Sequence, residues 1–553
     1  MPTVETKLSR IKNLIKGKLS VQELEKVLFD MGMELENLTE DDLKVEITAE
    51  RIDLITPEGL ARAINCYQGF VKNYQDVKVK KGDYIHNVNP SVKKYRAFTR
   101  SFVVKGLKFS DEDIKSLMWT QEKLHDTYGR KRKKVAVGVY DLNKIRFPVN
   151  YCAKKPNDIN FVPLGMKISL SGNQILSKHP AGRDYAHLIE KDDKYPVQED
   201  NSGQILSMPP IINSDSLGRI DTKTKDIFVE CTGSDEGVLD TTMDILATMF
   251  YDWGGQIYSV TIKDGNKKSI CPNLQNKKRS VSVKFINEWI GLDLKPLDVK
   301  KLLPKMEYDV LSVKGDQITF NIPSVRADIW HDVDIADDLA RAYGYNNIKP
   351  TLPNVSTVGE MLLINILKED LCNLLANLGL IEVKTFALTS SKDQYENMNI
   401  HEEKHISLGK NTNDKNVNMV RSWLTPELMK ALVANRNKEY PQNIFEADIV
   451  VLPDETADVR SKNVNKLSCV LCGEKENFTK IKGILDILIG YLGLEYSLHE
   501  TNHNSFISGR VGKIIINKKE VGIIGEIHPQ VLVNLGLELP VSSLELNLEE
   551  IFK

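Results

Sequence analysis

Aspartates crowd the stretch 328–338. A helix that begins near Asp334 places this residue, Asp337 and Asp338 on one face, because residues at i, i+3 and i+4 are neighbours on a helix. Asp328 comes just before and can converge on them. Carboxylates this close repel one another unless a cation or a partner's basic groups neutralise them, and an all-oxygen set favours Mg²⁺ over Zn²⁺. The alternative is an acidic helix N-terminus that the helix dipole stabilises.

A run of basic residues offers a different chemistry. It lies just before an apolar strand that begins at Val135 and consists of Arg130, Lys131, Arg132, Lys133 and Lys134. Such a patch can neutralise the phosphates of a nucleic acid. A charge run is also the usual composition of a solvated loop, so these residues leave both interpretations open.

Two short segments end apolar runs with small polar side chains. The segment 208–214, MPPIINS, has two prolines that fix an extended chain and then the polar pair Asn213 and Ser214. The segment 230–235, ECTGSD, closes a strand. Taken alone, the first is typical of a turn and the second of a helix cap.

Two metal-like patterns lack the context that they need. His401 to His405 matches the zinc-protease pattern HExxH, which works only on a helix with a third ligand beyond it. Its flanks are rich in asparagine, and Lys404 to Lys410 has no apolar stripe, so we expect a solvated loop. Cys469 and Cys472 form a lone CxxC in a predicted strand, which points them to opposite faces. The sequence contains no Walker A loop and no GxGxxG, so nothing indicates that this chain cradles a nucleotide.

An internal repeat indicates which elements position these residues. The offset that aligns Ile11 with Ile286 also aligns Arg51 with Arg326 and Asp53 with Asp328. After a short insertion, the sequence LARA at 60–63 recurs at 339–342. Amphipathic helices resemble one another by chance, but Arg-x-Asp followed by LARA does not. We predict a duplicated unit of a short helix, an amphipathic helix, a strand and a third helix.

The remaining patterns complete an α+β multidomain fold with mixed α/β segments. The longest helices are expected over 358–380 and 478–492, and a hairpin flanks the turn at 517–519. The predicted domains are the N-terminal repeat copy at 1–85, an α/β-mixed domain at 86–272, the second copy with the acidic cluster at 273–350, and an antiparallel sheet with helices at 351–553.

The composition excludes several classes of protein. The chain has 553 residues, of which 41% are hydrophobic and 27% charged, so it is globular and multidomain rather than disordered. A net charge of -2 excludes a protein that is basic throughout but allows a local nucleic-acid site. We see no signal-peptide core and no membrane span. The scattered cysteines favour a reducing compartment, and we expect a cytoplasmic protein.

These segments together resemble one family closely, the beta subunit of phenylalanyl-tRNA synthetase in its archaeal and eukaryotic form. The resemblance rests on segments that keep the family's order over nearly the whole chain, namely QEKLHDTYGRKRKKVAVGVYDLNKI, MPPIINS, CTGSD, VRADIWHDVDIADDLARAYGYNNI, YPQNIFE and FISGRVGKIIINKKEVGIIGEIHPQVL.

The resemblance implies a ligase subunit that does not itself activate phenylalanine. ATP would bind to an alpha subunit, and two alpha and two beta chains would assemble and bind tRNA. The C-terminal domain would be a catalytically inactive relative of the class II synthetase fold, and the second repeat copy would be of a nucleic-acid-binding type. The family's Mg²⁺ site, shared with alpha, matches Asp328, Asp334, Asp337 and Asp338.

In this family the middle domain hydrolyses tyrosine wrongly joined to the phenylalanine tRNA. An apolar pocket cannot strongly reject a near-isostere that adds one hydroxyl, so a second site must offer that hydroxyl a hydrogen bond. Glu230 is expected to sense the hydroxyl or to orient water. His125 is a further candidate base, although we expect it to be a structural residue at the end of a helix. The basic run 130–134 would meet the tRNA acceptor end. The implied editing residues are Leu206, Pro210, Asn213, Ser214, Glu230 and Thr232.

Two other functions stay open at this point. The chain could be a scaffold whose middle domain binds tRNA without editing it. It could also be a stand-alone metal-dependent phosphodiesterase that uses the aspartate cluster.

Overall fold

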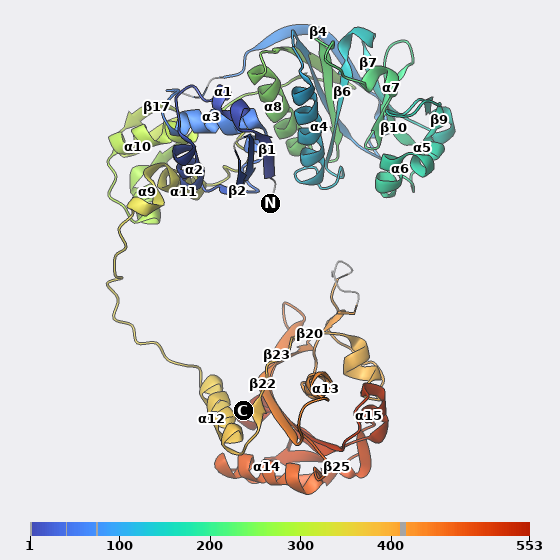
Figure 1. The fold of residues 1–553 in the computed structure, drawn as a ribbon, viewed down its shortest axis with the longest axis vertical. Coiled ribbons are helices and arrows are strands. Elements are labelled where there is room, and N and C mark those ends of the chain that lie inside the picture. Colours follow the sequence, from blue (N-terminus) through green and yellow to red (C-terminus); the bar gives the residue numbers. More distant parts are fainter. Residues whose placement is uncertain (1–2, 40, 73, 75, 410–415, 553) are drawn as a thin grey trace. The chain divides into compact units, whose positions relative to one another are not determined.

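The chain folds into two compact units, Met1–Leu352 and Pro353–Lys553. They are seen in a computed structural model that describes residues 3–39, 41–72, 74, 76–409 and 416–552 (Figure 1). Each unit buries its own hydrophobic side chains. The first unit contains both repeat copies and the domain between them.

The two repeat copies have the same order of α-helices and strands and differ in the place of a 3₁₀ turn. The first consists of β1 (Thr3–Lys7), α1 (Leu8–Leu14), α2 (Val21–Asp30), β2 (Glu34–Leu38), β3 (Asp42–Glu46), the 3₁₀ turn η1 (Ile52–Leu54) and α3 (Pro57–Tyr67). The second consists of β16 (Lys277–Ser282), α9 (Val283–Ile290), α10 (Pro296–Leu302), the 3₁₀ turn η6 (Leu303–Met306), β17 (Asp309–Lys314), β18 (Gln317–Ile322) and α11 (Asp332–Tyr343). The strand orders, β1-β3-β2 and β16-β18-β17, also correspond.

Each copy therefore has three strands where the sequence pattern predicted one. The predicted strand is β3 in the first copy and β18 in the second. The residues before it fold back as a hairpin partner, and the strand at the start of the copy pairs with its other edge. These flanking strands are short and largely polar, so they lack the apolar alternation that identifies a strand.

The repeated Arg-x-Asp motif makes the same ion pair in both copies. Arg51 contacts both carboxylate oxygens of Asp53 at 3.0 and 2.8 Å, and Arg326 contacts those of Asp328 at 2.9 and 2.7 Å. Both arginines are buried, and a buried guanidinium needs such a bidentate partner. The motif therefore has a structural role in each copy.

A ten-stranded sheet forms the domain between the copies. Its strands are β4 (Val79–Val88), β5 (Phe98–Lys105), β6 (Val135–Asp141), β7 (Val149–Lys154), β10 (Tyr195–Glu199), β11 (Ile205–Met208), β12 (Ile212–Asn213), β13 (Ile227–Gly233), β14 (Gln256–Asp264) and β15 (Lys267–Cys271). The order is β12-β11-β10-β7-β4-β14-β5-β13-β6, with β15 paired to β14. A short pair lies outside the sheet, β8 (Asn160–Phe161) with β9 (Leu170–Ser171).

Two long helices accompany this sheet (Figure 1), α4 (Asp111–Asp126) and α8 (Glu236–Asp252). Ser110 begins α4 with a capping box. Asp235 caps α8, whose apolar side chains pack on β5 and β13. Shorter helices complete the domain, α5 (Gly172–Lys178), α6 (Pro180–Tyr185) and α7 (Asp215–Gly218).

The sheet is strongly curled. Four strands separate β10 from β13 in its order, yet Gln198 Nε2 on β10 lies 3.5 Å from Glu230 Oε2 on β13. Strands in a flat sheet are spaced by about 4.8 Å, which would hold these two strands roughly 24 Å apart. Curling brings polar side chains from distant strands into one buried cluster.

The second unit is a seven-stranded sheet with helices. Its sheet strands are β19 (Ile381–Glu382), β22 (Gln442–Pro453), β23 (Ser461–Cys472), β27 (Val541–Asn547), β26 (Lys519–Ile527), β25 (Phe506–Ile516) and β24 (Ser497–Glu500), in spatial order. All neighbours are antiparallel except β19 and β22. The remaining elements are β20 (Leu388–Thr389), β21 (Met419–Val420), α12 (Leu363–Asn377), α13 (Thr425–Ala434), α14 (Phe478–Tyr491), α15 (Pro529–Leu535) and α16 (Leu548–Phe552).

These elements confirm the predicted antiparallel sheet and the hairpin around Asn517, which has a positive φ. The helix predicted over 358–380 is shorter at both ends, because residues 353–362 have no regular structure and Gly379, with a φ of 86°, ends α12.

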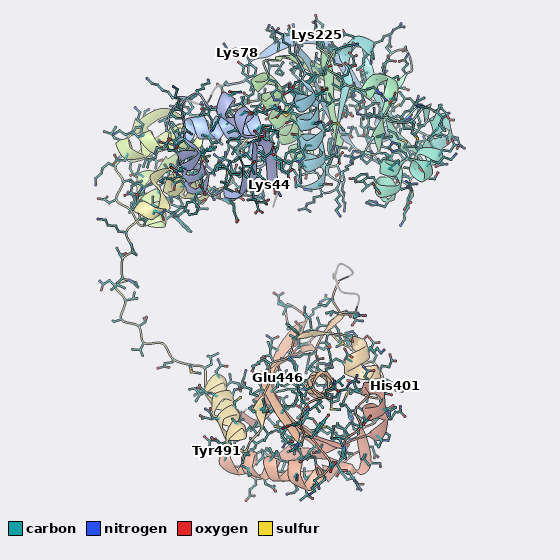
Figure 2. The ribbon with its side chains drawn as sticks, viewed as in Figure 1. Lys44, Lys78, Lys225, His401, Glu446 and Tyr491 are labelled. Atoms are coloured by element: carbon teal, nitrogen blue, oxygen red, sulfur yellow. The ribbon has the colours of Figure 1, made fainter. Side chains whose placement is uncertain are left out.

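The metal-like patterns of the second unit lie as predicted. Residues 401–409 form no helix, and His401 is exposed at the surface (Figure 2), while Lys410 and the asparagines 411 and 413 lie outside the described residues. Cys469 and Cys472 are buried free thiols on β23. Glu446 is buried within the unit, where Arg421 Nη1 contacts it at 2.8 Å (Figure 2). In the described part of the chain, no helix is long and apolar enough to cross a membrane.

Candidate functional site

A pocket of about 170 Å³ lies in the middle domain, beside α4 and the segment after β11. It suits a single side chain, since pockets for whole drug-sized ligands are about 300–1,000 Å³. Its lining residues are Met118, Gln121, Glu122, His125, Arg132, Ala136, Val137, Leu164, Ser207, Pro209, Pro210, Ile211, Ile212, Asn213 and Glu230.

A wider groove of about 1380 Å³ on the first unit is a weaker candidate. Two of its cations are already neutralised: Arg100 contacts Asp240 at 2.7 Å, and Lys134 contacts Asp235 at 2.9 Å. A buried carboxyl with a strongly perturbed pKa is a mark of functional sites. The groove has one in Asp244, whose pKa is raised to about 7, and the smaller pocket, which has the size of a single side chain, contains another.

Glu230 is that carboxyl, and β13 places it 2% exposed in the pocket wall. Burial raises its pKa to about 7, against the opposing effects of a hydrogen bond from Tyr140 and the charge of Arg96. The Tyr140 hydroxyl donates to Glu230 Oε1 at 2.9 Å, and Gln198 Nε2 donates to Oε2 at 3.5 Å. Near neutral pH, Glu230 can therefore be either ionised or protonated.

Gly138 makes room for this arrangement. It lies directly opposite Glu230 in the β6–β13 pair, and a Cβ at position 138 would overlap the Tyr140 hydroxyl and Glu230 Oε1. The backbone of β6 is regular there, so the glycine is required by side-chain space and not by its φ.

The structure brings some of the predicted editing residues to the pocket. Pro210, Asn213 and Glu230 line it, and Asn213 Oδ1 lies 3.3 Å from the Tyr140 hydroxyl oxygen. Leu206, Ser214 and Thr232 are buried but do not line it. Ser214 donates its backbone N–H to Leu206 O at 2.7 Å.

Thr232 belongs to the framework behind Glu230. Its side-chain oxygen accepts from Arg96 Nε at 3.0 Å, and its carbonyl accepts from Arg96 Nη2 at 2.5 Å. These contacts hold Arg96 near the carboxyl. Ser214 Oγ and Ser207 Oγ are buried without a hydrogen-bond partner among the described residues, and burying such a hydroxyl unpaired costs about 1–3 kcal/mol.

His125 has the structural role that the sequence suggested. Its Nε2 accepts the backbone N–H of Val137 at 2.8 Å, so the ring proton of the neutral form lies on Nδ1. Burial lowers its pKa. The tie fixes the end of α4 to strand β6, and the unprotonated nitrogen is not free to act as a base.

The basic run is divided in the structure. Arg132 turns inward, 11% exposed, donating from Nη1 to Ile211 O at 2.8 Å and from Nη2 to Glu122 Oε1 at 2.8 Å. Its guanidinium also lies 4.1 Å from the centroid of the Tyr185 ring. Arg132 is thus part of the pocket wall, whereas Arg130, Lys131 and Lys133 are exposed.

The four predicted metal ligands do not gather. Arg326 Nη2 contacts Asp328 at 2.7 Å and Asp338 at 2.6 Å. Burial alone would raise the pKa of Asp328, but the charge of Arg326 holds that pKa below its ordinary value. Among the described residues, no group of three or more His, Cys, Asp or Glu side chains is arranged to hold a metal ion.

The other two aspartates have local partners on α11. The helix begins at Asp332, two residues earlier than expected, and Asp334 caps it by accepting the backbone N–H groups of Trp330 and His331, both at 2.7 Å. Asp337 accepts from Arg341 Nε at 3.0 Å and from the Tyr345 hydroxyl. This geometry fits the helix-cap alternative for Asp334.

Sequence reasoning missed Tyr140, Gln198 and Ser207 around Glu230, and His86 behind Gln198. One signal was present for Tyr140: within VAVGVY it is two residues from Gly138, so both lie on the same face of β6. Nothing local indicates Gln198 or His86, because curling of the sheet brings Gln198 to Glu230 and His86 contacts Gln198 from another strand.

Comparisons with known proteins agree over the whole chain. Family models match at 1–70, described as the Phe-tRNA synthetase beta subunit B1 domain, at 279–345, the tRNA synthetase B5 domain, and at 348–548, the phenylalanyl tRNA synthetase beta chain CLM domain.

Curated relatives and a solved structure resemble the chain as well. The phenylalanine–tRNA ligase beta subunit of Pyrococcus furiosus is 37% identical over 100% of both chains, and that of Methanocella arvoryzae is 34% identical over 99% of both. A crystal structure of an N-terminal fragment of the Pyrococcus horikoshii phenylalanyl-tRNA synthetase beta subunit has a TM-score of 0.60 and 32% identity, covering 62% of this chain and 99% of the fragment.

Proposed function

The chain belongs to the beta-subunit family of phenylalanine–tRNA ligases, as its sequence resemblance predicted, and we propose that its middle domain hydrolyses tRNA wrongly charged with tyrosine. Membership of this family makes it a subunit of an aminoacyl-tRNA ligase, which implies an alpha partner and tRNA binding. The editing reaction, the substrate and the site residues are our proposal.

The buried Glu230 in a pocket of single-side-chain size supports the proposal. A tyrosine side chain in that pocket would donate its hydroxyl to the Glu230 carboxylate. Phenylalanine would exclude water from the remaining acceptor position of the carboxylate without supplying a donor, and a buried polar group that loses a hydrogen bond costs about 1–3 kcal/mol, more when it is charged. A site built to bond a hydroxyl rejects the analogue that lacks it, so the pocket would retain tyrosine and release phenylalanine.

The reaction is hydrolysis of an ester. The oxygen of water bonds to the carbonyl carbon of the aminoacyl group, the bond from that carbon to the terminal ribose oxygen breaks, and the ribose oxygen takes a proton. We assign Glu230 to recognition of the tyrosine hydroxyl, because Tyr140 and Gln198 already fix its two oxygens toward donors. The ionised form, favoured above a pKa of about 7, is the better acceptor.

Purified Tyr-tRNA added to the assembled alpha–beta complex tests this function. We expect rapid hydrolysis by the unmutated complex, at least tenfold loss in Glu230→Ala, and a smaller loss in Ser214→Ala, with His401→Ala as a matched surface control. Hydrolysis no faster than in buffer alone would refute the proposal and leave the non-editing scaffold.

We also propose that the alpha partner covers the apolar surface around α12 in the second unit. Leu363 is 84% exposed, and further exposed apolar side chains of the second unit adjoin it in sequence, namely Val355, Val358, Met361, Leu362, Ile366, Leu378, Ile381, Phe386 and Leu388. Contiguous exposed apolar residues mark interaction sites, and a ligase beta subunit requires an alpha chain.

Charged substitutions test this surface. Val358→Asp with Leu363→Asp should prevent co-purification of alpha, whereas Val459→Asp should not, although Val459 is 76% exposed on the same unit. Equal co-purification of both variants would contradict the assignment.

We further propose an assembly of two alpha and two beta chains, ATP bound by alpha, a cytoplasmic location, and phosphate contacts from Arg130, Lys131 and Lys133.

The aspartates 328–338 do not fit a Mg²⁺ site as this chain arranges them, because Arg326 already neutralises two of them. A shared ion would need ligands from alpha, and metal analysis of the alpha–beta complex tests for it. The same ion pairs give the phosphodiesterase alternative no support.

A further inference from the structure

One fully buried histidine lies next to the proposed editing site and has no part in it so far. His86 is on β4, and both of its ring nitrogens have partners. Nδ1 lies 2.9 Å from Ser101 Oγ on β5, and Nε2 lies 2.9 Å from Gln198 Oε1 on β10. Two bonds to a buried imidazole fix its orientation completely.

A neighbouring hydroxyl sets the direction of these bonds. Thr99 donates its hydroxyl proton to the Cys231 carbonyl at 3.0 Å, so toward Gln198 it can only accept. Gln198 Nε2 lies 3.4 Å from Thr99 Oγ1 and 3.5 Å from Glu230 Oε2, and only an N–H group suits both. Gln198 must therefore turn its carbonyl oxygen to His86.

The tautomer of His86 follows from that orientation. Gln198 Oε1 is an acceptor, so His86 Nε2 carries the proton, and Nδ1 accepts the hydroxyl proton of Ser101. Ser101 then donates to His86, His86 donates to Gln198, and Gln198 donates to Glu230. These three side chains are called the relay below.

We propose that His86 is a positioning residue of the editing site: through the relay it fixes the amide of Gln198 so that an N–H group faces Glu230 and holds its carboxylate ready to accept a substrate hydroxyl. This inference rests on the proposed editing function. It adds a specificity-determining group that never touches the substrate.

Burial supports a constant role for the ring. It lowers the pKa of His86 to about 4, so the imidazole stays neutral at physiological pH and keeps one tautomer. The charged and titratable groups that bear on Glu230 are Tyr140 from β6, Arg96 before β5, Tyr151 from β7 and its neighbour Cys231. The neutral amide of Gln198, at the end of the relay, donates to the carboxylate. The Gln198 bond lowers the pKa of Glu230, so losing it raises that pKa.

Two variants separate positioning from a merely structural role. Glutamine places an amide near the position of histidine Nε2, and asparagine places one near Nδ1. His86→Gln should preserve the bond to Gln198, whereas His86→Asn should keep only the Ser101 side. In the alpha–beta complex we expect His86→Asn to lower the Tyr-tRNA over Phe-tRNA ratio of kcat/KM about tenfold and to shift the pH midpoint of hydrolysis upward.

His86→Gln should stay within about threefold of the unmutated complex, and its pH midpoint should not move. Equal losses in the two variants, with no change of pH midpoint in either, would overturn the proposal. The thermal unfolding midpoint of each variant shows whether it is folded.

A measurement without hydrolysis tests the relay itself. Nitrogen-15 spectra of histidine-labelled chain, with the His86 signal identified by its loss in His86→Gln, should show Nε2–H and no titration between pH 5.5 and 8. A ring protonated at Nδ1 would refute the relay. Absence of Tyr-tRNA hydrolysis by the unmutated complex would instead refute the editing function, so the two failures are distinguishable.

Discussion

The Tyr140 hydroxyl lies 2.9 Å from Glu230 Oε1, directly above the Cα of Gly138. The three residues come from two adjacent strands, and none can change without moving the others. A buried carboxyl with two fixed donors and a pKa of about 7 is suited to accept one more hydrogen bond, because a carboxylate has about four acceptor positions.

Removing the Tyr140 hydroxyl should change the pH dependence of editing. The bond lowers the pKa of Glu230, so Tyr140→Phe should raise it, by about one unit. Because the ionised carboxylate is the proposed acceptor, hydrolysis of Tyr-tRNA should fall several-fold at pH 7 and recover toward pH 9. Initial rates between pH 6 and 9 measure this. Tyr95→Phe, which removes an exposed hydroxyl bound to Asp193, is the control, and identical profiles for both variants would contradict the prediction.

A methyl group at position 138 should damage the site directly. Gly138→Ala would push against the Tyr140 hydroxyl and Glu230 Oε1, and overpacking of this kind costs about 1–3 kcal/mol. We expect a lower unfolding midpoint and at least a tenfold loss of hydrolysis. Gly237→Ala, whose Cβ would make only an ordinary contact, should alter neither. A fully active Gly138→Ala would show that the pair is not needed.

The raised pKa of Glu230 also makes stability depend on pH. The folded state holds the proton more tightly than the unfolded chain does, so the stability that this proton gives is complete below about pH 4.5 and is lost as the pH rises through 7. Glu230→Gln cannot ionise. It should therefore stabilise the chain at pH 8, by up to about 3 kcal/mol, and have little effect at pH 5.

Denaturant unfolding of both proteins at the two pH values measures this difference. Asp244 and Asp252 also have pKa values raised by burial, but they are present in both proteins and cancel. A stabilisation of equal size at pH 5 and 8 would show that ionisation of Glu230 is not its cause.

Arg326 should be indispensable to the second repeat copy. Arg326→Leu leaves the carboxylates of Asp328 and Asp338 buried without a counter-charge, and breaking a buried ion pair in this way costs about 3–5 kcal/mol. Adding Asp328→Asn and Asp338→Asn to it should recover much of the loss. Arg279→Leu breaks a part-exposed pair with Asp332 and should cost less than about 1 kcal/mol. Thermal unfolding of the unmutated chain, Arg326→Leu, the triple variant and Arg279→Leu tests this. Equal losses of stability in Arg326→Leu and Arg279→Leu would refute it.

The basic run should have two separable roles. Lys131→Ala with Lys133→Ala should weaken tRNA binding and reduce its dependence on salt, because exposed lysines bind phosphates. Arg132→Ala should instead reduce Tyr-tRNA hydrolysis with little change in the salt dependence, because its guanidinium holds Ile211 and Glu122 in the pocket wall. Filter binding at several salt concentrations separates the two, with Lys225→Ala as an exposed control. If tRNA binding depends on salt in the same way in the double lysine variant, Arg132→Ala and Lys225→Ala, the two roles proposed for the basic run are contradicted.

Much of the architecture could be read from local sequence. The duplication was visible because Arg-x-Asp followed by LARA occurs twice in the chain. In the structure, Arg51 pairs with Asp53 and Arg326 pairs with Asp328 in the same way. Capping residues such as Ser110 mark helix starts through bonds that span only three residues. Glu230 and Asn213 could be predicted as site residues only through resemblance to a family.

The tertiary structure decided how those residues are used. Curling of the middle sheet brings Gln198 to Glu230 across four intervening strands, and such long-range contacts leave no local pattern in either strand. Arg132 faces the pocket and not the solvent because its partners, Ile211 and Glu122, come from other elements. The sequence by itself determined which side chains are present and which elements they are on. Which counter-charge or donor each one meets, and hence its protonation and its role, depends on packing between strands that are far apart in the chain.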